Sequence, residues 1–506
     1  MKNLKNQYPV ILFCVLYLIF IPFYLYQAGS DTVSYIAIAE NYLAGNWSLA
    51  MNGYWSPLFS FMLMPFVALH IEPLMGVKII GLASSILIFY SFKKLADIFM
   101  LKKEDTVIAT YFLVPLLLWC SFSNTCPDVM ATSILLFFLT KLFQTSYTPK
   151  DLVLIPLLGF VCYLGKYYNI YFIILAFIGR AVFIKNEYRI KELAITLGLY
   201  LAICSIWLFC IYNKYDKFTP TTATNYNLYI NGPELFLEIK KAQETTGRTP
   251  TVRKCPAEGG NLMSYLDYGK YRYTSWEDPS YYQGTWSPFK SAWDMKFYFT
   301  NIIWVNFMDM LSMLVVYFAA FILLLMLYRK KLIETFNGKT LLILLMAAVY
   351  PAGYILTHFE GRYVFFSEFL IVFLLMYIAA NLPVKNRKLI VTGTFLVLSV
   401  FYSYQLITHM KNKGVETSKI AATKINNYVD GSVLYCTPYI WYRTLYVSYF
   451  NKKIKFHDSL KNVHDAPEKK FLLVCKTTEV GEIQSEFPQS QTVYVSRDFV
   501  VMNITK

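Results

Sequence analysis

Residues 6–30 of this chain are NQYPVILFCVLYLIFIPFYLYQAGS, a stretch without a single charged side chain. An α-helix that crosses a bilayer needs about 20 consecutive, mostly apolar residues, so this stretch predicts a membrane span. It lacks the small-residue cleavage site of a removed signal peptide, and we expect it to be retained as the first span. Ten further apolar runs follow, at residues 73–92, 104–121, 128–145, 152–165, 168–184, 193–213, 308–328, 340–357, 364–382 and 389–409. The pattern predicts an all-α polytopic membrane protein with about eleven spans.

The composition agrees with this interpretation and excludes a soluble multidomain chain. Of the 506 residues, 56% are hydrophobic and 16% are charged, whereas soluble domains carry about 25% charged residues. Aromatic residues reach 18%, with 42 Tyr and 40 Phe, which suits membrane–water interfaces and sugar-binding clefts. The net charge of +15 does not indicate a nucleic-acid partner, because its Lys and Arg residues form short clusters between apolar runs without a nucleic-acid-binding motif.

The distribution of Lys and Arg predicts which side of the membrane each connection faces. If the N-terminus is cytoplasmic, every second connection is cytoplasmic too, and these segments carry nineteen Lys and Arg residues. They are the N-terminus itself and residues 93–103, 141–150, 180–191, 329–339 and 385–388. The first outer loop and the short outer connections contain two, Lys166 and Arg362. Because cytoplasmic loops of membrane proteins are enriched in Lys and Arg, we predict a cytoplasmic N-terminus.

Two long outer loops interrupt the spans. Residues 28–72 are partly apolar and contain no Lys or Arg, which predicts helices that lie along the membrane surface. Residues 214–300 are polar and rich in Tyr and Trp. Aromatic faces stack on sugar rings and also pack on lipid. We expect this second loop to cover the entrance to an outer-face site.

The end of the chain differs in character from the spans. Strand-like runs at residues 432–436, 471–475 and 492–503 alternate with helical or turn stretches. They predict a membrane domain over residues 1–412 and a small soluble α/β domain, also extracytoplasmic, over residues 413–506. Cys436 and Cys475 end two of the strand-like runs and are a candidate disulfide.

A few charged side chains lie where an outer-face reaction could use them. Asp31 follows the first span and either caps the next helix or acts as a general base. Lys166 and Arg362 are candidates for binding a phosphate, with Lys78, near the outer end of its span, as a third. The alternative for these cations is snorkelling or pairing with carboxylates. Asp128 starts a span, either as a first-turn acid favoured by the helix dipole or as a second acidic group of the site.

Several of these residues lie in motifs that resemble those of GT-C fold glycosyltransferases. Residues 31–47, with Asp31, Tyr35 and the segment Glu40-Asn41-Tyr42-Leu43-Ala44-Gly45, are similar to the first outer loop of one branch of that fold. This branch holds protein O-mannosyltransferases and aminoarabinose transferases of lipid A. The other motifs follow in family order over residues 31–370. They are Gly53-Tyr54-Trp55-Ser56-Pro57-Leu58, Gly76-Val77-Lys78, Pro127-Asp128, Gly165-Lys166 and Gly361-Arg362-Tyr363.

The resemblance implies a GT-C fold and an inverting transfer of a sugar from a polyprenyl-phosphate-linked donor to an acceptor hydroxyl on the extracytoplasmic face. Asp31 would be the general base and Asp128 a second acidic site residue. The donor phosphate would bind Lys166, Arg362 and Lys78, and the substrate would contact Tyr35, Tyr54 and Tyr363. The acceptor would be a lipid, a glycan or a protein. The expected location is multi-pass in a membrane, with its lipids as partners, and most simply in a bacterial inner membrane.

The sequence departs from the family pattern at positions that bear on metal use. Many relatives have Glu after the first Asp, where this chain has Thr32. An acidic and a basic residue precede the motif's Pro in the aminoarabinose branch, where this chain has Trp55 and Ser56. His358 and Glu360 could form a ligand pair, but an interfacial His with a hydrogen-bond partner is the better interpretation. We therefore expect no cofactor and a metal-independent reaction.

Two other functions fit a polytopic chain of this kind. A transporter or flippase of lipid-linked sugars would need broken helices, paired repeats and polar side chains at the middle of the membrane. The spans contain few charges there, and the polar candidates gather on one side. A polysaccharide polymerase or ligase would favour Arg-rich outer loops, which the sequence lacks. The transporter or flippase is the main alternative to the transferase.

Overall fold

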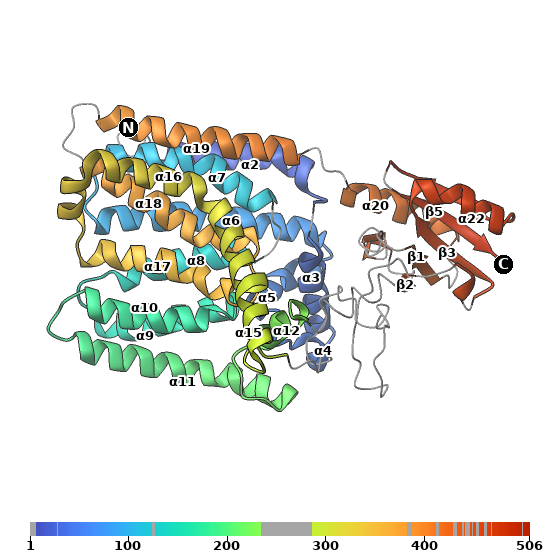
Figure 1. Cartoon of the computed structure of the whole chain (residues 1–506), viewed down its shortest axis with the longest axis horizontal. Coiled ribbons are helices and arrows are strands. Elements are labelled where there is room, and N and C mark those ends of the chain that lie inside the picture. Colours follow the sequence, from blue (N-terminus) through green and yellow to red (C-terminus); the bar gives the residue numbers. More distant parts are fainter. Residues whose placement is uncertain are drawn as a thin grey trace.

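A bundle of long helices makes up most of the molecule, and a small sheet with helices beside it lies at one end of that bundle (Figure 1). The computed structural model describes residues 7–27, 29–123, 127–233, 286–381, 387–410, 414–428, 433–437, 440, 446–447, 449–451, 455–459, 463–466, 468–497 and 499–506.

Each of the predicted spans coincides with a helix. The bundle helices are α2 (Tyr8–Tyr24), α6 (Pro73–Ile98), α7 (Lys103–Ser123), α8 (Asp128–Leu142), α9 (Pro149–Gly165), α10 (Asn169–Phe183), α11 (Arg189–Tyr215), α16 (Trp304–Thr335), α17 (Gly338–Ile355), α18 (Phe365–Asn381) and α19 (Arg387–His409). Among the described residues, six helices are long and apolar enough to cross a membrane, whereas α2 and α10 are apolar but shorter. An all-α membrane fold is therefore confirmed, and the number of spans stays a prediction.

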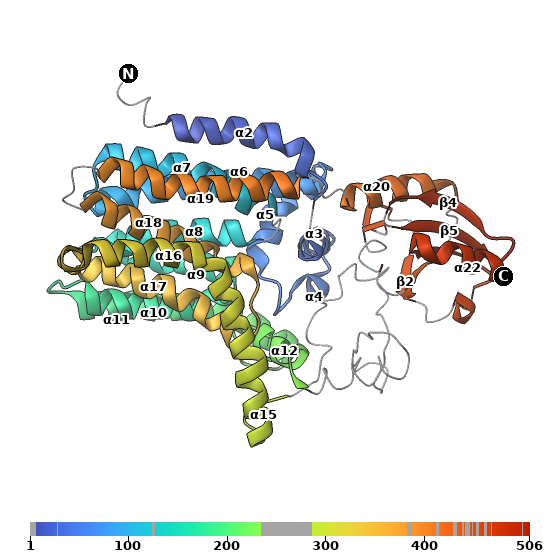
Figure 2. The ribbon, with the colours of Figure 1, turned by 45° about the horizontal axis from the view of Figure 1, so that its top comes forward.

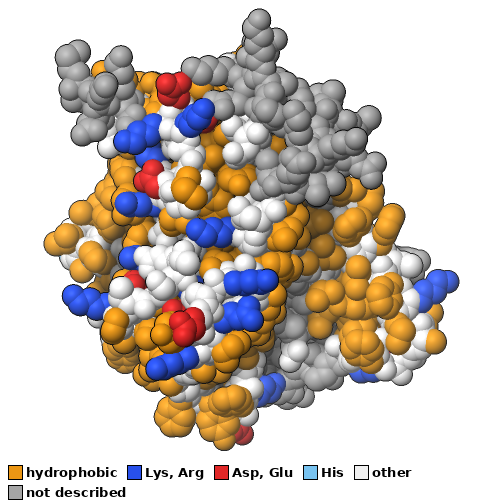
Figure 3. Space-filling view, turned by 90° about the vertical axis from the view of Figure 1, so that its left-hand side faces the viewer, with side chains coloured by type: hydrophobic (Ala, Val, Ile, Leu, Met, Phe, Trp, Pro, Cys, Tyr) orange, Lys and Arg blue, Asp and Glu red, His pale blue; other side chains and the backbone are white. Residues whose placement is uncertain are grey.

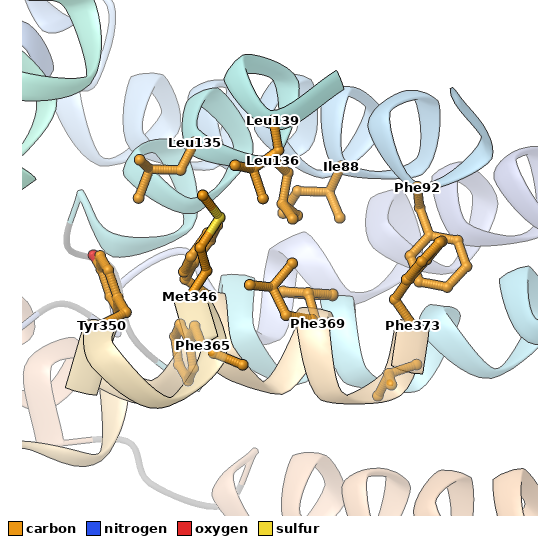
Figure 4. Packing of buried hydrophobic residues seen from close by; sticks show 14 of the residues in the cluster. Ile88, Phe92, Leu135, Leu136, Leu139, Met346, Tyr350, Phe365, Phe369 and Phe373 are labelled. Carbon is orange, nitrogen blue, oxygen red and sulfur yellow. The ribbon is translucent and has the colours of Figure 1, made fainter. Parts of the chain in front are cut away.

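The core of the bundle forms where α6 and α8 face α17 and α18 (Figure 4). Leu135, Leu136 and Leu139 of α8 are fully buried there. The ring centroids of Phe92 in α6 and Phe373 in α18 are 5.5 Å apart in an edge-to-face contact. Aromatic pairs of this geometry add roughly 0.5–1.5 kcal/mol beyond the burial of their area. This packing fixes α8 and α18, whose ends carry candidate site residues.

The first outer loop is helical, as predicted. It contains α3 (Ser30–Leu43), α4 (Trp47–Ala50) and α5 (Pro57–Ala68). Both views place these helices at the end of the bundle that faces the sheet (Figures 1 and 2). The ring of Tyr35 in α3 meets those of Trp55 and Phe59 edge-on, at 5.3 Å from each. The helix of the first predicted span is shorter than the uncharged run at residues 6–30, because α2 ends at Tyr24 and α3 starts at Ser30.

The boundary predicted for the second outer loop is wrong at its end. Helix α15 (Ala292–Phe297) runs through the π-helical segment η3 (Tyr298–Ile303) into α16, so the helix begins before residue 300. Ser291 caps it by accepting a hydrogen bond from the backbone N–H of Asp294 at 3.0 Å. This first part contains polar side chains, so a search for apolar runs did not detect it as helix. Helix α12 (Ala223–Ile230) lies in the same loop, while residues 234–285, with most of its Tyr and Trp, lie outside the described residues.

The small C-terminal sheet is present, and within the described residues it has five strands in the order β2-β1-β3-β5-β4. They are β1 (Val433–Cys436), β2 (Lys455–Ser459), β3 (Lys470–Cys475), β4 (Gln491–Val495) and β5 (Val500–Thr505), with α20 (Gly414–Lys424) and α22 (Val480–Glu486). Strands β1, β2 and β3 are parallel neighbours, and β5 runs antiparallel to both β3 and β4. The single run predicted at 492–503 is two strands. The polar strand β2, Lys-Phe-His-Asp-Ser, was missed because it lacks an apolar pattern.

The candidate disulfide between Cys436 and Cys475 is wrong, because both residues are buried free cysteines. Successive side chains of a strand point to opposite faces of the sheet. Cys436 packs in the cluster that includes Ala421 and Ala422 of α20, while Cys475 packs in the cluster that includes Ile483 of α22. The two thiols thus lie on opposite faces of a sheet that is covered on both sides.

Lys and Arg side chains gather at the end of the bundle opposite the sheet (Figure 3). Two ion pairs there join neighbouring helices: Arg180 with Glu192 at 2.7 Å, and Lys141 with Asp151 at 3.9 Å. This separation of the charged end from the first-loop helices agrees with the positive-inside pattern of the sequence.

The close contact between the end of α10 and the start of α17 provides a test of the bundle packing. An added Cβ at Gly338 would lie 2.0 Å from the carbonyl oxygen of Phe183, a backbone atom that cannot move aside. We expect Gly338→Ala to lower the free energy of unfolding by about 1–3 kcal/mol, measured as a lower midpoint of thermal unfolding in detergent. Gly198 in α11 is the matched control, since an added Cβ there meets nothing within 4 Å. Equal midpoints for both variants would contradict this packing.

Candidate active site

A cavity of about 720 Å³ opens where the first-loop helices meet the bundle. Its lining comes from the first loop, the start of α8, the α9–α10 connection, α12, η3, α17 and the 3₁₀ turn η4 (Gly361–Val364). Seven of the eight candidate site residues line it. They are Asp31, Tyr35, Tyr54, Asp128, Lys166, Arg362 and Tyr363.

The charged side chains form one connected group. Arg362 Nη2 donates to Asp31 Oδ2 at 2.5 Å, and Lys166 Nζ donates to Asp128 Oδ1 at 2.5 Å. Arg362 Nε lies 3.6 Å from Asp128 Oδ2, which joins the two pairs. These four side chains are between 6% and 16% exposed, so they are screened from bulk solvent yet reachable from the cavity. Two carboxylates and two cations, far apart in the sequence, therefore share one pocket.

Asp31 and Asp128 occupy equivalent places in their helices. Gly29, not Ser30 or Asp31, is the N-cap of α3, so Asp31 lies in the first turn with its side chain directed to Arg362. Asp128 is the first residue of α8. A helix N-terminus favours an acidic side chain, and both residues lie in the first turn of their helices. The first-turn interpretation of Asp128 is therefore compatible with its place in the cavity.

Aromatic rings surround the Lys166 ammonium. Its Nζ lies 3.9 Å from the ring centroid of Tyr363 and 4.8 Å from that of Tyr354. These two rings stack with centroids 4.3 Å apart. Burial lowers the pKa of Lys166 below its usual value, although Asp128 and the hydrogen bond to it oppose the shift. The rings thus provide a face for the cation where water is excluded.

Hydrogen bonds fasten the first loop to the α9–α10 connection. Tyr167 donates its backbone N–H to Ser56 Oγ at 2.9 Å and its hydroxyl to the carbonyl oxygen of Asn52 at 2.7 Å. The Asn52 side chain in turn accepts from the backbone N–H groups of Tyr54 and Trp55. Lys166 precedes Tyr167 directly, so these bonds fix its position relative to the loop. Ser56, which replaces a family residue, thus has a structural partner.

Tyr54 contributes a neutral hydroxyl to the cavity. Burial, together with the negative charges of Asp31 and Glu360, raises the pKa of Tyr54 well above its usual range, and Arg362 only partly opposes this. The hydroxyl therefore stays protonated at every working pH and can donate a hydrogen bond to a substrate oxygen.

Glu360 belongs to the charged group, although the sequence indicated it only as a partner of His358. Its Oε2 lies 2.8 Å from Arg362 Nε, and its Oε1 lies 3.3 Å from His358 Nε2. Burial favours its neutral form, but the His358 hydrogen bond and the positive charge of Arg362 outweigh this and hold the pKa of Glu360 at about 2. The Glu-x-Arg spacing was the signal that sequence reasoning did not use. In the described residues, no group of three His, Cys, Asp or Glu side chains is arranged to hold a metal ion.

Lys78 is the candidate that the structure does not bring into the cavity. It is 1% exposed, and its Nζ donates to the carbonyl oxygen of Gln27 at 3.4 Å and lies 5.5 Å from the Phe122 ring centroid. The Gln27 carbonyl belongs to the connection between α2 and α3. The prediction that Lys78 binds the donor phosphate is therefore set aside in favour of a contact that holds this connection.

This placement makes Lys78 and Lys166 a matched pair. We expect Lys78→Met to leave the affinity for undecaprenyl phosphate unchanged. The Lys78 ammonium donates to a backbone carbonyl oxygen, and Lys78 is not among the residues that line the cavity. Lys166→Met is expected to lower that affinity at least about tenfold, because a hydrogen bond to a charged group is lost. Titration of the lipid onto the purified variants measures both. Equal losses in the two variants would contradict the placement of Lys78.

The bundle, the first-loop helices and the terminal sheet together define a membrane protein of the GT-C fold. Two solved structures similar to this chain are of ArnT from Cupriavidus metallidurans, a lipid A aminoarabinose transferase. The structure bound to undecaprenyl phosphate has a TM-score of 0.54 at 11% identity, covering 98% of each chain. The apo structure has a TM-score of 0.53 at 10% identity, covering 98% of this chain and 97% of that one. No protein-family model and no curated protein matches the sequence.

The fold expected from the sequence motifs is thus confirmed over nearly the whole chain. Identity near 10% establishes a shared fold, not a shared reaction. The fold and the apolar helices together make this chain an integral membrane protein.

Proposed function

We propose that this protein transfers a sugar from a polyprenyl-phosphate-linked donor to an acceptor hydroxyl, with inversion at the anomeric carbon. The observation that carries the proposal is the convergence of Asp31, Asp128, Lys166 and Arg362 on one cavity. A sugar phosphate offers an anionic leaving group for the two cations, and an acceptor hydroxyl offers a proton for a carboxylate.

Asp31 is the proposed general base. It would take the proton of the acceptor hydroxyl as that oxygen forms its bond to the anomeric carbon. The bond between that carbon and the phosphate oxygen breaks on the opposite face, and its electron pair leaves with the polyprenyl phosphate. Asp128, which accepts from Lys166, would orient that cation and the acceptor side of the cavity. The products are the inverted glycoside and the lipid phosphate.

Lys166 and Arg362 would stabilise the leaving phosphate. The planar guanidinium of Arg362 can donate two parallel hydrogen bonds to phosphate oxygens, and the Lys166 ammonium adds a point charge. The gain is larger than in water because both cations are largely buried. Tyr54 and Tyr363 lie beside them and would contact the sugar.

Part of the cavity lining suits a lipid chain. It includes Tyr171 and Leu175 of α10 and Leu356 after α17, each about half exposed. A lining that combines charged side chains with exposed apolar ones matches a donor that is an anion on a long isoprenoid chain. The ArnT structure with undecaprenyl phosphate lends the same support, since its fold is shared.

The proposed orientation follows from the charge distribution. With the Lys- and Arg-rich end of the bundle in the cytoplasm, the cavity and the C-terminal sheet face the extracytoplasmic side. For a bacterial source this places the protein in the inner membrane. The residues over 413–506 would form a separate outer domain.

The test is a comparison of products in a host membrane. Surface glycolipids and glycoproteins from cells that express the wild type are analysed by mass spectrometry beside those from cells that express Asp31→Asn. We expect one class of product to gain a sugar mass with the wild type alone. The same gain with the variant, or faster flipping of a fluorescent lipid-linked sugar in liposomes without any transfer, would refute the proposal and favour a flippase.

A further inference from the structure

Arg362 forms ion pairs with carboxylates through two different nitrogens of its guanidinium, and only the contact of Nη2 with Asp31 has hydrogen-bond geometry. Nε lies 2.8 Å from Glu360 and 3.6 Å from Asp128, whereas Nη2 donates to Asp31 at 2.5 Å. With Nε facing Glu360, a phosphate can still bind the guanidinium end-on, through the parallel N–H donors of Nη1 and Nη2. The donor phosphate and Asp31 therefore compete for Nη2.

Glu360 is itself held from its other side. His358 Nε2 lies 3.3 Å from Glu360 Oε1, and His358 Nδ1 lies 3.4 Å from the side-chain nitrogen of Asn231. The His358 ring therefore lies between the Asn231 side chain and the Glu360 carboxylate. Asn231 is tied in turn to the carbonyl oxygen of Thr357 at 3.2 Å. This chain of contacts makes Glu360 the anchored partner of Arg362.

Asp31, unlike Glu360, must leave Arg362 in order to act as a general base. In this structure Asp31 Oδ2 accepts a short hydrogen bond from Arg362 Nη2. A general base at this position must be turned toward the acceptor hydroxyl when the donor is bound. While it accepts from Nη2, Asp31 is directed to the guanidinium and not to an acceptor hydroxyl.

Resting on the proposed function, we propose that Glu360 is a positioning residue that holds Arg362 through the ion pair at Nε, and that the donor phosphate displaces Asp31 from Nη2. Phosphate binding then releases Asp31 to take the acceptor proton. The base is sequestered in the absence of donor and becomes available after the donor has bound, so that the two substrates bind in order, donor first.

Two isosteric variants distinguish this proposal from a general electrostatic effect of removing one negative charge near Arg362. Asp31→Asn and Glu360→Gln each remove one negative charge beside the same guanidinium, and simple repulsion predicts that both tighten phosphate binding. The proposal predicts opposite signs. Asp31→Asn should bind undecaprenyl phosphate about tenfold more tightly, because a competing charged hydrogen bond is gone. Glu360→Gln should bind it more weakly, because the guanidinium loses its anchor.

The measurement is a titration of undecaprenyl phosphate onto the full-length protein in nanodiscs, followed by the shift in thermal unfolding. Asp31→Ser, which removes the same carboxylate, replaces Asp31→Asn if that variant does not fold. Equal tightening in the Asp31 and Glu360 variants, or none in either Asp31 variant, overturns the proposal. Arg362→Gln separates this failure from that of the proposed function: if it binds the lipid as the wild type does, the phosphate site itself is wrong.

Discussion

Asp31→Asn is expected to lower the rate of sugar transfer about 10²–10⁴-fold, the usual contribution of a general base. Asparagine keeps the shape of the side chain and a hydrogen-bond acceptor for Arg362, but it cannot take a proton from the acceptor hydroxyl. The measurement is the initial rate of sugar incorporation in membranes with equal amounts of folded protein.

Asp309→Asn is the control for this prediction. Asp309 is exposed on α16 and is not among the residues that line the cavity, so the same chemical change there should leave the rate unaltered. If Asp31→Asn transfers sugar as fast as this control, the assignment of Asp31 as the base is wrong.

Arg362→Gln should also lose most of the activity, by about 10²–10³-fold, since it removes a preorganised donor to the leaving group. It leaves Asp31, Asp128 and Glu360 around one ammonium, that of Lys166, so the protein should also become less stable. Arg362→Lys restores the charge but not the planar fork of donors. We therefore expect this second variant to recover stability while its turnover stays low.

Rates and unfolding midpoints measured on the same preparations distinguish the two effects. Arg497 is exposed in the connection between β4 and β5, and Arg497→Gln serves as the matched control. Full activity in Arg362→Lys would mean that any cation suffices and that the two-bond phosphate contact is not needed.

The helices of the membrane part followed from the sequence because each apolar run is long enough to show its character without knowledge of its neighbours. Length alone could not show that residues 6–30 break near Gly29, since the turn contains no charge. The start of α15 was missed because Asp294 and Lys296 make this short helix polar. Strand β2 is recognisable through its pairing with β1 and not through its own residues.

The sequence predicted which residues belong to the site better than it predicted the contacts between them. Asp31, Lys166 and Arg362 were indicated by charge and position in outer connections, and the cavity brings them together. Lys78 shares that sequence character, but its helix face points to α2 and the Gln27 carbonyl, which a motif cannot reveal. The pairing of Arg362 with Asp31 spans 331 positions and depends on how α3 packs on the bundle.

A structure of this protein in nanodiscs with undecaprenyl phosphate would test the central claim most directly. The account predicts the phosphate within about 3 Å of Arg362 Nη2 and Lys166 Nζ, the isoprenoid chain leaving between α10 and α17, and Asp31 turned away from the guanidinium. A phosphate bound outside the cavity, or one that contacts neither cation, would contradict it.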